Sequence, residues 1–373
     1  MSVDIEKRQF MSKAGSVAVA TAAAGALAPM VYAKNVKHEV DCIMAWPANF
    51  PGFTPPVQRS ADEIYKLTDG EIKFNVVGAG QEMANGNKVN PFKALELVSD
   101  GSAAMANVAA YYYMNVSPIM GLFTSMPYGM ATDQFAGWWS SGAGKAFNAW
   151  LPTQGANVHA IRGMSTGLQA GGWFQKEINS VDDFKGLRYR IPGMGGSVMK
   201  RLGAETISLP GGKIPSALQN GDLDATEWVG PYLDSKMGFH KMAKYYYTDG
   251  FHEPGGTLMN FINLDFWNAL TEKQRTIIHV CLVKYQFVVG TEALFNENIT
   301  AYQMFKNEGV QFRQYPLAVR QALKKESEAL FMETMQTNAD TERFFRSFME
   351  YKMLSGEYLR QFDDTLRCQV PAE

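Results

Sequence analysis

The sequence predicts an α/β protein with two sheet-containing lobes, followed by a region made mostly of helices. Strand-like and helical segments alternate, with short links, over residues 39–113 and again over residues 158–231. This alternation is typical of a parallel or mixed sheet covered by helices. From about Thr271 the pattern is helical. The 373-residue chain is 46% hydrophobic and 19% charged, a composition that fills globular cores, and its length favours roughly two domains.

The first stretch reads as strand, helix, strand, helix and strand. Prolines stand at the start of the first expected helix and Gly70 follows its end, which are the usual start and stop signals. The expected strands cover residues 39–47, 71–80 and 102–113, and the expected helices cover residues 54–70 and 90–101.

The second stretch repeats the pattern with different residues. Strands are expected at 158–167, 168–174, the run ending in Arg190, 206–210 and 224–231, and helices after Ser180, at 195–205 and at 213–223. In the C-terminal part, Thr271 and Gln274 form a capping box before a helical pattern that continues to residue 309. Two more helices are expected at 318–336 and 341–362.

The first 33 residues form a separate segment that we exclude from fold reasoning. A polar, basic stretch precedes a short alanine-rich apolar stretch and then small residues before Ala33. This order predicts a secretory signal that is cut after Ala33. Within it, Lys7–Met11 (KRQFM) resembles a twin-arginine signal with lysine in place of one arginine, so we expect twin-arginine export, with the general secretory route as the alternative. No later segment has an uncharged apolar run long enough to span a bilayer.

The charge and cysteine content limit the classes of partner and site. The formal net charge is −2 and the chain has no basic runs, which argues against a nucleic acid as partner. The three cysteines, Cys42, Cys281 and Cys368, are odd in number and widely spaced. We expect unpaired thiols and no zinc or redox site built from close cysteines.

Two α/β lobes together with an export signal favour a binding protein that closes about a hinge. The cleft between such lobes is the usual place for a small ligand. We expect lobe I to contain residues 34–162 and 256–300, and lobe II to contain residues 163–255 and 301–373 with the C-terminal helices.

A catalytic alternative comes from Gly163–Gly167, which matches the G-x-S-x-G nucleophile elbow with Ser165 as nucleophile. That motif needs a helix after the turn, whereas Leu168–Phe174 reads as a strand. A secreted serine hydrolase is therefore kept only as the remote alternative to a protein that is not an enzyme.

Several polar residues stand in apolar surroundings and are candidates for a binding site. Arg190 ends an expected strand before a glycine-rich turn, where its guanidinium can hold a carboxylate through two hydrogen bonds; a surface ion pair is the other interpretation. Gln169 lies among leucine, alanine and glycines, so its amide needs backbone, ligand or ion as a partner. Glu227 is set against Trp228 in an apolar run. The run Tyr111–Tyr113 offers either core packing or a hydroxyl group for a ligand.

With these residues in hand, the chain resembles the periplasmic solute-binding subunit (DctP-type) of a tripartite ATP-independent periplasmic (TRAP) transporter, and within that family the 2-oxo acid-binding branch. The resemblance covers nearly all of the chain after the signal. Its most specific part is an arginine strand, a glycine turn, "LPGG" and "EWVGP" in that order and spacing, and the other matching segments are "GLQAGGWF" and "KMAKYYYTDGFHEPGG".

The resemblance implies a two-lobed α/β periplasmic binding protein with a hinge cleft, a long helix spanning both lobes, and a helical C-terminal region that forms a homodimer. It implies a small organic acid anion, a 2-oxo acid or related hydroxy acid, as ligand, and the TRAP membrane permease subunits as partners. Arg190 matches the residue that grips the carboxylate, and Tyr112 is our choice for a ligand-facing tyrosine. Gln169, Glu227 and the main-chain carbonyl of Trp228 match the ligands of a bridging Na⁺ or Ca²⁺.

The sequence departs from the family pattern at a few positions. Lys213 and Pro215 stand where the 2-oxo acid binders carry an acidic and a larger residue, and Glu205 has no assigned place. These departures leave the identity of the acid open, so a larger or sugar-like organic acid on the same fold is the alternative ligand.

Overall fold

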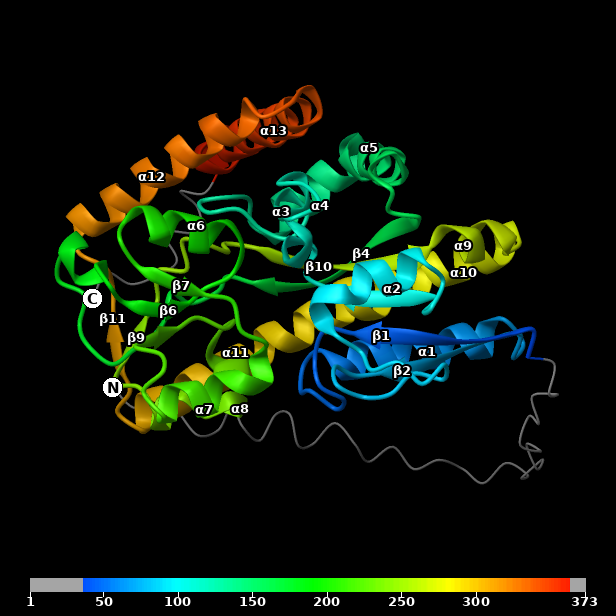
Figure 1. Ribbon diagram of the computed structural model, residues 1–373, viewed down its shortest axis with the longest axis horizontal. Coiled ribbons are helices and arrows are strands. Elements are labelled where there is room, and N and C mark those ends of the chain that lie inside the picture. The colour runs from blue at the N-terminus through cyan, green and yellow to red at the C-terminus, as the bar shows by residue number, and fades with distance from the viewer. Residues whose placement is uncertain (1–35, 363–373) are drawn as a thin grey trace, which may run out of the picture. The chain divides into compact units, whose positions relative to one another are not determined.

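The computed structural model describes residues 36–362, which contain two mixed β-sheets and the helices around them (Figure 1). The predicted export signal at residues 1–33 and Cys368 lie outside the described residues. The first sheet has five strands in the order β2-β1-β3-β10-β4. Their bounds, in that order, are Ile72–Val77, His38–Met44, Met105–Val108, Gly256–Asn263 and Val158–Gly167.

The parallel strands β1, β2 and β3 are linked by α1 (Thr54–Leu67) and α2 (Ala94–Ser99). Two prolines open α1, where they are tolerated because the N–H groups of the first turn have no partner within the helix. Strand β10 runs antiparallel between β3 and β4 and is buried along its whole length. The predicted alternation over residues 39–113 is therefore confirmed except at its end, where Ala110–Tyr113 forms a 3-10 turn instead of continuing the strand.

The second sheet has six strands in the order β11-β9-β5-β8-β6-β7. Their bounds, in that order, are Gln311–Arg313, Tyr245–Tyr247, Gly172–Phe174, Ala225–Thr226, Arg188–Arg190 and Glu205–Ile207. Strand β6 lies between the parallel strands β7 and β8, with Arg190 opposite Ile207 and Thr226. Because the carboxyl ends of parallel strands meet at one edge of a sheet, this register brings Arg190 and Glu227 together.

One long helical segment runs from Glu272 to Asn307 and contains α10 (Glu272–Cys281), a π-helical part (Leu282–Gly290) and α11 (Thr291–Asn307). The predicted capping box at Thr271 is present. The segment packs against β4 of the first sheet and against α1, which links two strands of that sheet. It also packs against α8 (Pro231–Met237), which follows β8 of the second sheet. Among residues 36–362 it is also the single helix that is long and apolar enough to cross a membrane, by length and composition alone.

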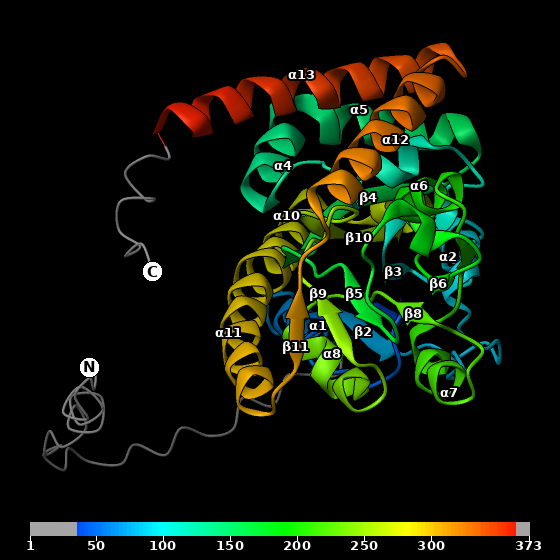
Figure 2. The same ribbon diagram turned by 90° about the vertical axis from the view of Figure 1, so that its left-hand side faces the viewer.

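The C-terminal region consists of α12 (Leu317–Met335) and α13 (Ala339–Phe362), close to the predicted bounds. Helix α12 packs on α6 (Gly193–Arg201), and α13 packs on two short helices, α3 and α4. The last turns of α13 project beyond the sheets (Figure 2). The helices of residues 119–154 were not assigned from the sequence: α3 (Ile119–Leu122), α4 (Thr132–Trp138), a π-helical turn (Trp139–Ala143), α5 (Gly144–Trp150) and a 3-10 turn (Leu151–Gln154). The remaining α7 covers Ile214–Gln219 and α9 covers Leu264–Ala269.

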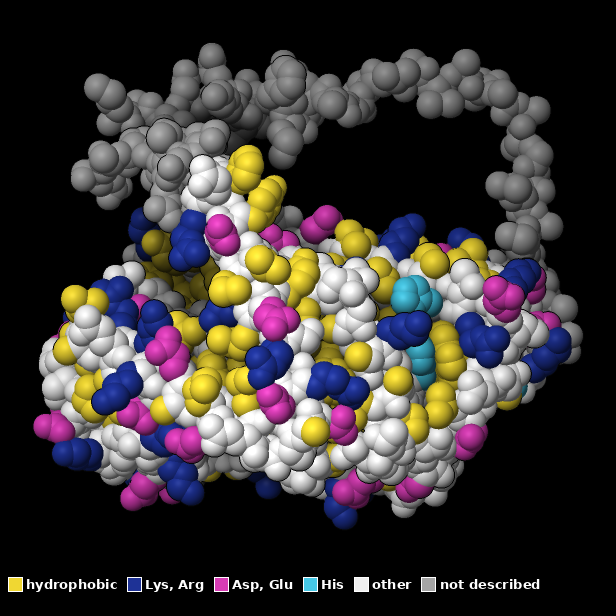
Figure 3. Space-filling model, turned by 90° about the horizontal axis from the view of Figure 1, so that it is seen from above, with side chains coloured by type: hydrophobic (Ala, Val, Ile, Leu, Met, Phe, Trp, Pro, Cys, Tyr) yellow, Lys and Arg dark blue, Asp and Glu magenta, His cyan; other side chains and the backbone are white. Residues whose placement is uncertain are grey.

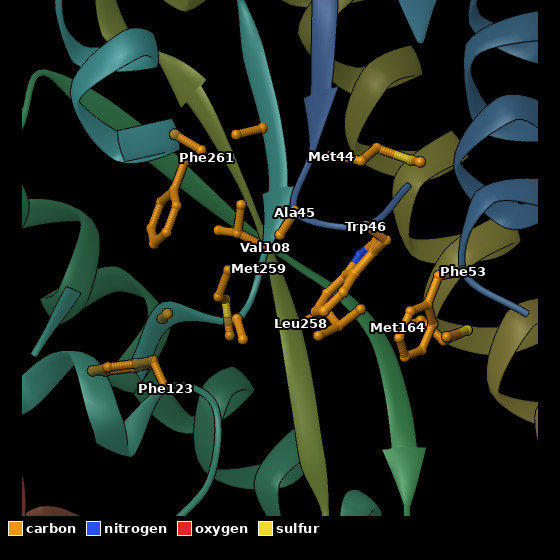
Figure 4. Close-up of a cluster of buried hydrophobic side chains, with 14 of the residues drawn as sticks. Met44, Ala45, Trp46, Phe53, Val108, Phe123, Met164, Leu258, Met259 and Phe261 are labelled. Carbon is orange, nitrogen blue, oxygen red and sulfur yellow. The ribbon is translucent and has the colours of Figure 1, made fainter. Parts of the chain in front are cut away.

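Buried side chains form a large hydrophobic cluster around the first sheet and a smaller one around the second. Figure 4 shows part of the larger cluster, in which Trp46, Phe53, Met164 and Leu258 lie side by side. Cys42 and Cys281 are buried and unpaired, as the sequence predicts. The described residues, 36–362, fall within one compact unit, so the division of this unit into lobe I and lobe II stays a prediction.

Candidate ligand-binding site

A small pocket is lined by segments that follow strands of both sheets. Its volume is about 20 Å³, room for about one ordered water. Its lining residues are Trp46, Phe53, Ala109, Tyr111, Tyr112, Thr124, Thr166, Gln169, Arg190, Trp228, Val229, Glu253, Gly256 and Leu258. The structure thus brings together four of the predicted site residues in the pocket lining, and the fifth, Glu227, pairs with Arg190.

Arg190 ends β6 and is 2% exposed. Its Nη1 donates to the carboxylate of Glu227 and, over 3.2 Å, to the carbonyl of Glu227. Its Nε donates to the carbonyl of Leu209 over 3.1 Å, and its guanidinium lies 5.2 Å from the ring centre of Trp228. Burial alone would lower the pKa of Arg190, but Glu227 and the nearby Tyr112 raise it, and the net shift is upward. The guanidinium is therefore charged. A fixed positive charge in a small pocket can bind an anion.

Glu227 follows the two-residue strand β8 and is 1% exposed. Its backbone N–H donates to the carbonyl of Arg190 over 3.0 Å, which continues the β6–β8 pairing. One carboxylate oxygen pairs with Arg190, and the other lies 3.3 Å from Nε2 of His252. A carboxylate this deeply buried needs such partners, because an unpaired charge would be costly. The surface ion pair considered for Arg190 is therefore wrong: the pair is buried.

Gln169 lies in the link between β4 and β5 and is 7% exposed. Its Nε2 donates to a carboxyl oxygen of Glu253 over 2.6 Å and to the hydroxyl of Thr166 over 3.0 Å. With the amide in this orientation, Nε2 forms both contacts. Its Oε1 is buried and has no hydrogen-bond partner. This oxygen is therefore available to a ligand or a cation. From the sequence alone, a ligand or ion and a backbone group were equally good partners for the amide.

Glu253 lines the pocket, is 5% exposed, and was missed in the sequence analysis. Burial, and then the nearby charge of Glu227, raise its pKa well above the usual range of a carboxyl group. The signal that could have found it is a charged residue between an aromatic residue and the Pro-Gly-Gly turn in "FHEPGG". Next to it, Gly256 leaves room that a side chain would take: an added Cβ would lie 2.6 Å from Glu253 Oε2.

The aromatic walls of the pocket come from Trp228, Trp46 and two tyrosines. The Trp228 ring meets Trp46 edge-on at 6.4 Å and Phe50 at 5.9 Å between ring centres. Tyr111 and Tyr112 both line the pocket, from the 3-10 turn and not from a strand. Burial raises the pKa of Tyr112 to about 12, which moves it even further above neutral pH, and the protonated hydroxyl group can donate a hydrogen bond to an anion.

Ser165 does not form a nucleophile elbow. It lies inside β4, is fully buried, and its hydroxyl bonds to the carbonyl of Gly256 at 3.0 Å and the hydroxyl of Thr132 at 2.7 Å. The turn and helix that expose such a serine are replaced by the link to β5. The serine hydrolase is therefore not favoured. Lys213 and Glu205 are exposed.

Within residues 36–362, no group of three or more histidine, cysteine, aspartate or glutamate side chains is arranged to hold a metal ion. The ligand set that the resemblance implies does not need three such side chains. It contains one carboxylate, one amide oxygen and one main-chain carbonyl, which are the hard oxygen donors that sodium and calcium prefer. The unpartnered Gln169 Oε1 fits this set.

Comparisons with known proteins agree with this fold. Residues 44–338 match the DctP family of bacterial extracellular solute-binding proteins, family 7. The monocarboxylate 2-oxoacid-binding periplasmic protein of Nostoc sp. is 35% identical over 312 residues, which cover 83% of this chain and 82% of that protein.

Two crystal structures of TRAP periplasmic solute-binding proteins are similar over 90% of this chain and 100% of theirs. The protein from Pseudoalteromonas atlantica, with bound sodium and pyruvate, has a TM-score of 0.83 and 28% identity. The protein from Colwellia psychrerythraea, with bound calcium and pyruvate, has a TM-score of 0.84 and 29% identity. The predicted two-lobed α/β fold is confirmed by these structures. The chain belongs to family 7 of the bacterial extracellular solute-binding proteins, the DctP family.

Proposed function

We propose that this protein is the periplasmic substrate-binding subunit of a TRAP transporter, and that it binds a small 2-oxo acid such as pyruvate, or a related hydroxy acid, with a bridging Na⁺ or Ca²⁺. One observation carries the proposal: the charged, buried Arg190 shares a small pocket with an unpartnered amide oxygen of Gln169. The Nostoc relative is named for 2-oxo acids, and both solved structures hold pyruvate with a metal ion.

In this proposal Arg190 holds the carboxylate of the acid. Nη1 and Nε of Arg190 already donate to Glu227 and to the carbonyl of Leu209, so the acid would accept charge-assisted hydrogen bonds from the remaining N–H groups of the guanidinium. The Tyr112 hydroxyl group, which is protonated at neutral pH as tyrosines ordinarily are, is a second donor to the acid. The rings of Trp46 and Trp228 line the apolar side of the pocket.

Glu227, the Gln169 Oε1 and the carbonyl of Trp228 would hold the cation. A bound cation supplies positive charge between Glu227 and the acid, two anionic groups that would otherwise repel each other. The Gln169 side chain is already oriented for this role by Glu253 and Thr166, so little conformational entropy is lost on binding. Glu227 is oriented by Arg190 and His252.

The partners and location follow from the same assignment. The protein hands its acid to the membrane permease subunits of the transporter, after export by the twin-arginine pathway. We also propose a homodimer formed through α13. Hydrophobic side chains gather on the projecting end of this helix (Figure 3), and a large exposed apolar patch marks an interaction surface. The exposed residues there are Met353, Leu354, Tyr358, Leu359 and Phe362.

The experiment is to purify the protein without added ligand and to identify what comes with it. Mass spectrometry should find a small 2-oxo or hydroxy acid, and elemental analysis should find sodium or calcium. A thermal-shift screen should then show that pyruvate or a close homologue raises Tm in an ion-dependent way. Stabilisation by sugar acids alone would replace the proposed ligand with the alternative, and absence of stabilisation by any organic acid would overturn the proposal.

A further inference from the structure

Asp234 is a buried carboxylate outside the pocket whose two oxygens have different partners. It lies in the first turn of α8 and is fully buried. Its Oδ2 accepts a hydrogen bond of 2.9 Å from the indole Nε1 of Trp173, and its Oδ1 accepts one of 3.1 Å from the backbone N–H of Val229. No pocket residue other than Val229 is among these partners.

The bond to Val229 connects Asp234 to both parts of the proposed ion site. Val229 follows Trp228 in the chain, and its carbonyl accepts a hydrogen bond of 2.9 Å from the backbone N–H of Ala170, which follows Gln169. Both backbone groups of Val229 are therefore held, one by Asp234 and the other by Ala170. Their positions determine where the Trp228 carbonyl lies relative to the Gln169 side chain.

Stability alone does not explain a carboxylate at this position. Asp234 lies among aromatic and apolar side chains, with the Tyr246 hydroxyl group also facing its carboxyl group. The Trp173 ring stacks on Tyr246 at 4.2 Å between ring centres, and Leu233 is fully buried. Burying a carboxylate in such a place is costly, and a well-packed apolar residue is often equal or better for stability. A carboxylate does provide two acceptors that fix two donors at once, which is what a rigid support for a binding site needs.

We propose that Asp234 is a positioning residue of the ion site: by holding the Val229 N–H, it sets the distance between the Trp228 carbonyl and the Gln169 amide. This inference rests on the proposed function. Groups that orient the ligands of a metal ion in this way are worth about 10- to 100-fold in metal affinity.

The test is Asp234→Asn, which keeps the size of the side chain but offers an amide NH₂ to one of the two donors. The ion concentration at half-saturation is measured by calorimetry for Na⁺ and for Ca²⁺, with pyruvate saturating. We expect it to rise about tenfold or more in Asp234→Asn for the ion that wild type uses. The matched control is Tyr247→Phe in β9 of the second sheet. It removes the buried hydroxyl group that accepts a hydrogen bond of 2.7 Å from the Ile178 N–H. It should lower Tm without changing the half-saturation.

The outcomes separate the two proposals. An Asp234→Asn half-saturation within twofold of wild type, or an equal rise in Tyr247→Phe, would overturn the positioning role alone. If wild type fails to bind pyruvate both in the presence of Na⁺ and in the presence of Ca²⁺, the proposed function fails, and the positioning role fails with it. Should Asp234→Asn not fold by circular dichroism, Trp173→Phe removes the Oδ2 donor without a change of charge. It is expected to raise the half-saturation in the same direction, and an unchanged value would overturn the inference.

Discussion

Arg190 and Glu227 form an ion pair that is almost completely buried, with side chains 2% and 1% exposed. The Nη1 of Arg190 donates both to the carboxylate and to the main-chain carbonyl of Glu227. Removal of one partner from a buried pair commonly costs about 3–5 kcal/mol, because the other charge is left unpaired. Affinity at this site must therefore be measured together with the free energy of unfolding.

Arg190→Lys should weaken binding of the acid by about 10- to 100-fold, because an ammonium group cannot donate to Glu227, to the Leu209 carbonyl and to the acid in the geometry of the planar guanidinium. Calorimetry with pyruvate measures the change. Arg188→Lys is the matched control: Arg188 lies in the same strand and pairs at the surface with Asp224. Equal losses in the two variants would show that Arg190 acts only through the stability of the strand.

Glu227→Gln should weaken the ion and the acid together, because the amide removes the negative charge that holds the cation. The affinity for pyruvate is compared with and without Na⁺ or Ca²⁺, and Glu205→Gln serves as a control at an exposed acid. An affinity that is unchanged both with and without the ion would exclude Glu227 from the ion site.

Gly211→Ala should lower the affinity, whereas Gly212→Ala should not. A Cβ at Gly211 would collide with the Trp228 ring, while a Cβ at Gly212 would meet no atom within 4 Å. Overpacking of this kind costs about 1–3 kcal/mol, and here it displaces a wall of the pocket. A change in tryptophan fluorescence reports the displaced ring, and calorimetry with pyruvate measures the affinity. The same affinity in both variants would mean that the ring position is not important for binding.

The stability of the protein should fall between pH 6.5 and about 4, partly because of His159. Burial, and then His279 and Arg275, lower the pKa of His159 from 6.5 to about 4. As the pH falls below 6.5, the unfolded chain binds a proton that the folded protein does not, which favours unfolding. His159→Phe preserves the stack on Trp267, whose ring centre is 4.4 Å away.

Urea unfolding at pH 7.5 and pH 5 tests this contribution of His159. The His159→Phe protein should lose less stability than wild type between the two pH values, by about 1 kcal/mol once solvent screening is allowed for. A larger loss in the variant would reverse the assigned direction of the shift.

Leu354→Glu should convert the proposed dimer to a monomer, because it places a charge among the exposed hydrophobic residues of α13. The control variant is Leu317→Glu on α12. Leu317 is 64% exposed and Leu354 is 61% exposed, so the two substitutions are made at similarly exposed leucines. Sedimentation of the two variants and wild type gives their masses. A monomeric wild type would remove the dimer from the proposal.

Much of the fold could be predicted from the sequence, because helix and strand periods and their stop signals are local. The strands and helices around Arg190 and the capping box at Thr271 are examples. The helices of residues 119–154 were missed, since they are short and interrupted by turns. Tyr111 and Tyr112 were placed in a strand, but their position in a 3-10 turn still brings both into the pocket.

The sequence by itself determined the chemistry of the site: an arginine, a glutamine and a glutamate set in apolar segments, and a family pattern that joins them. Only the tertiary structure decided that the side-chain oxygen of Gln169 is left unpartnered, that Glu253 lies in the pocket, and that Asp234 accepts a hydrogen bond from the backbone of Val229 in the pocket wall. The physical reason is that these features depend on contacts between segments far apart in the chain. Gln169 and Glu253, for example, are 84 residues apart, and their burial creates the need for a hydrogen-bond partner.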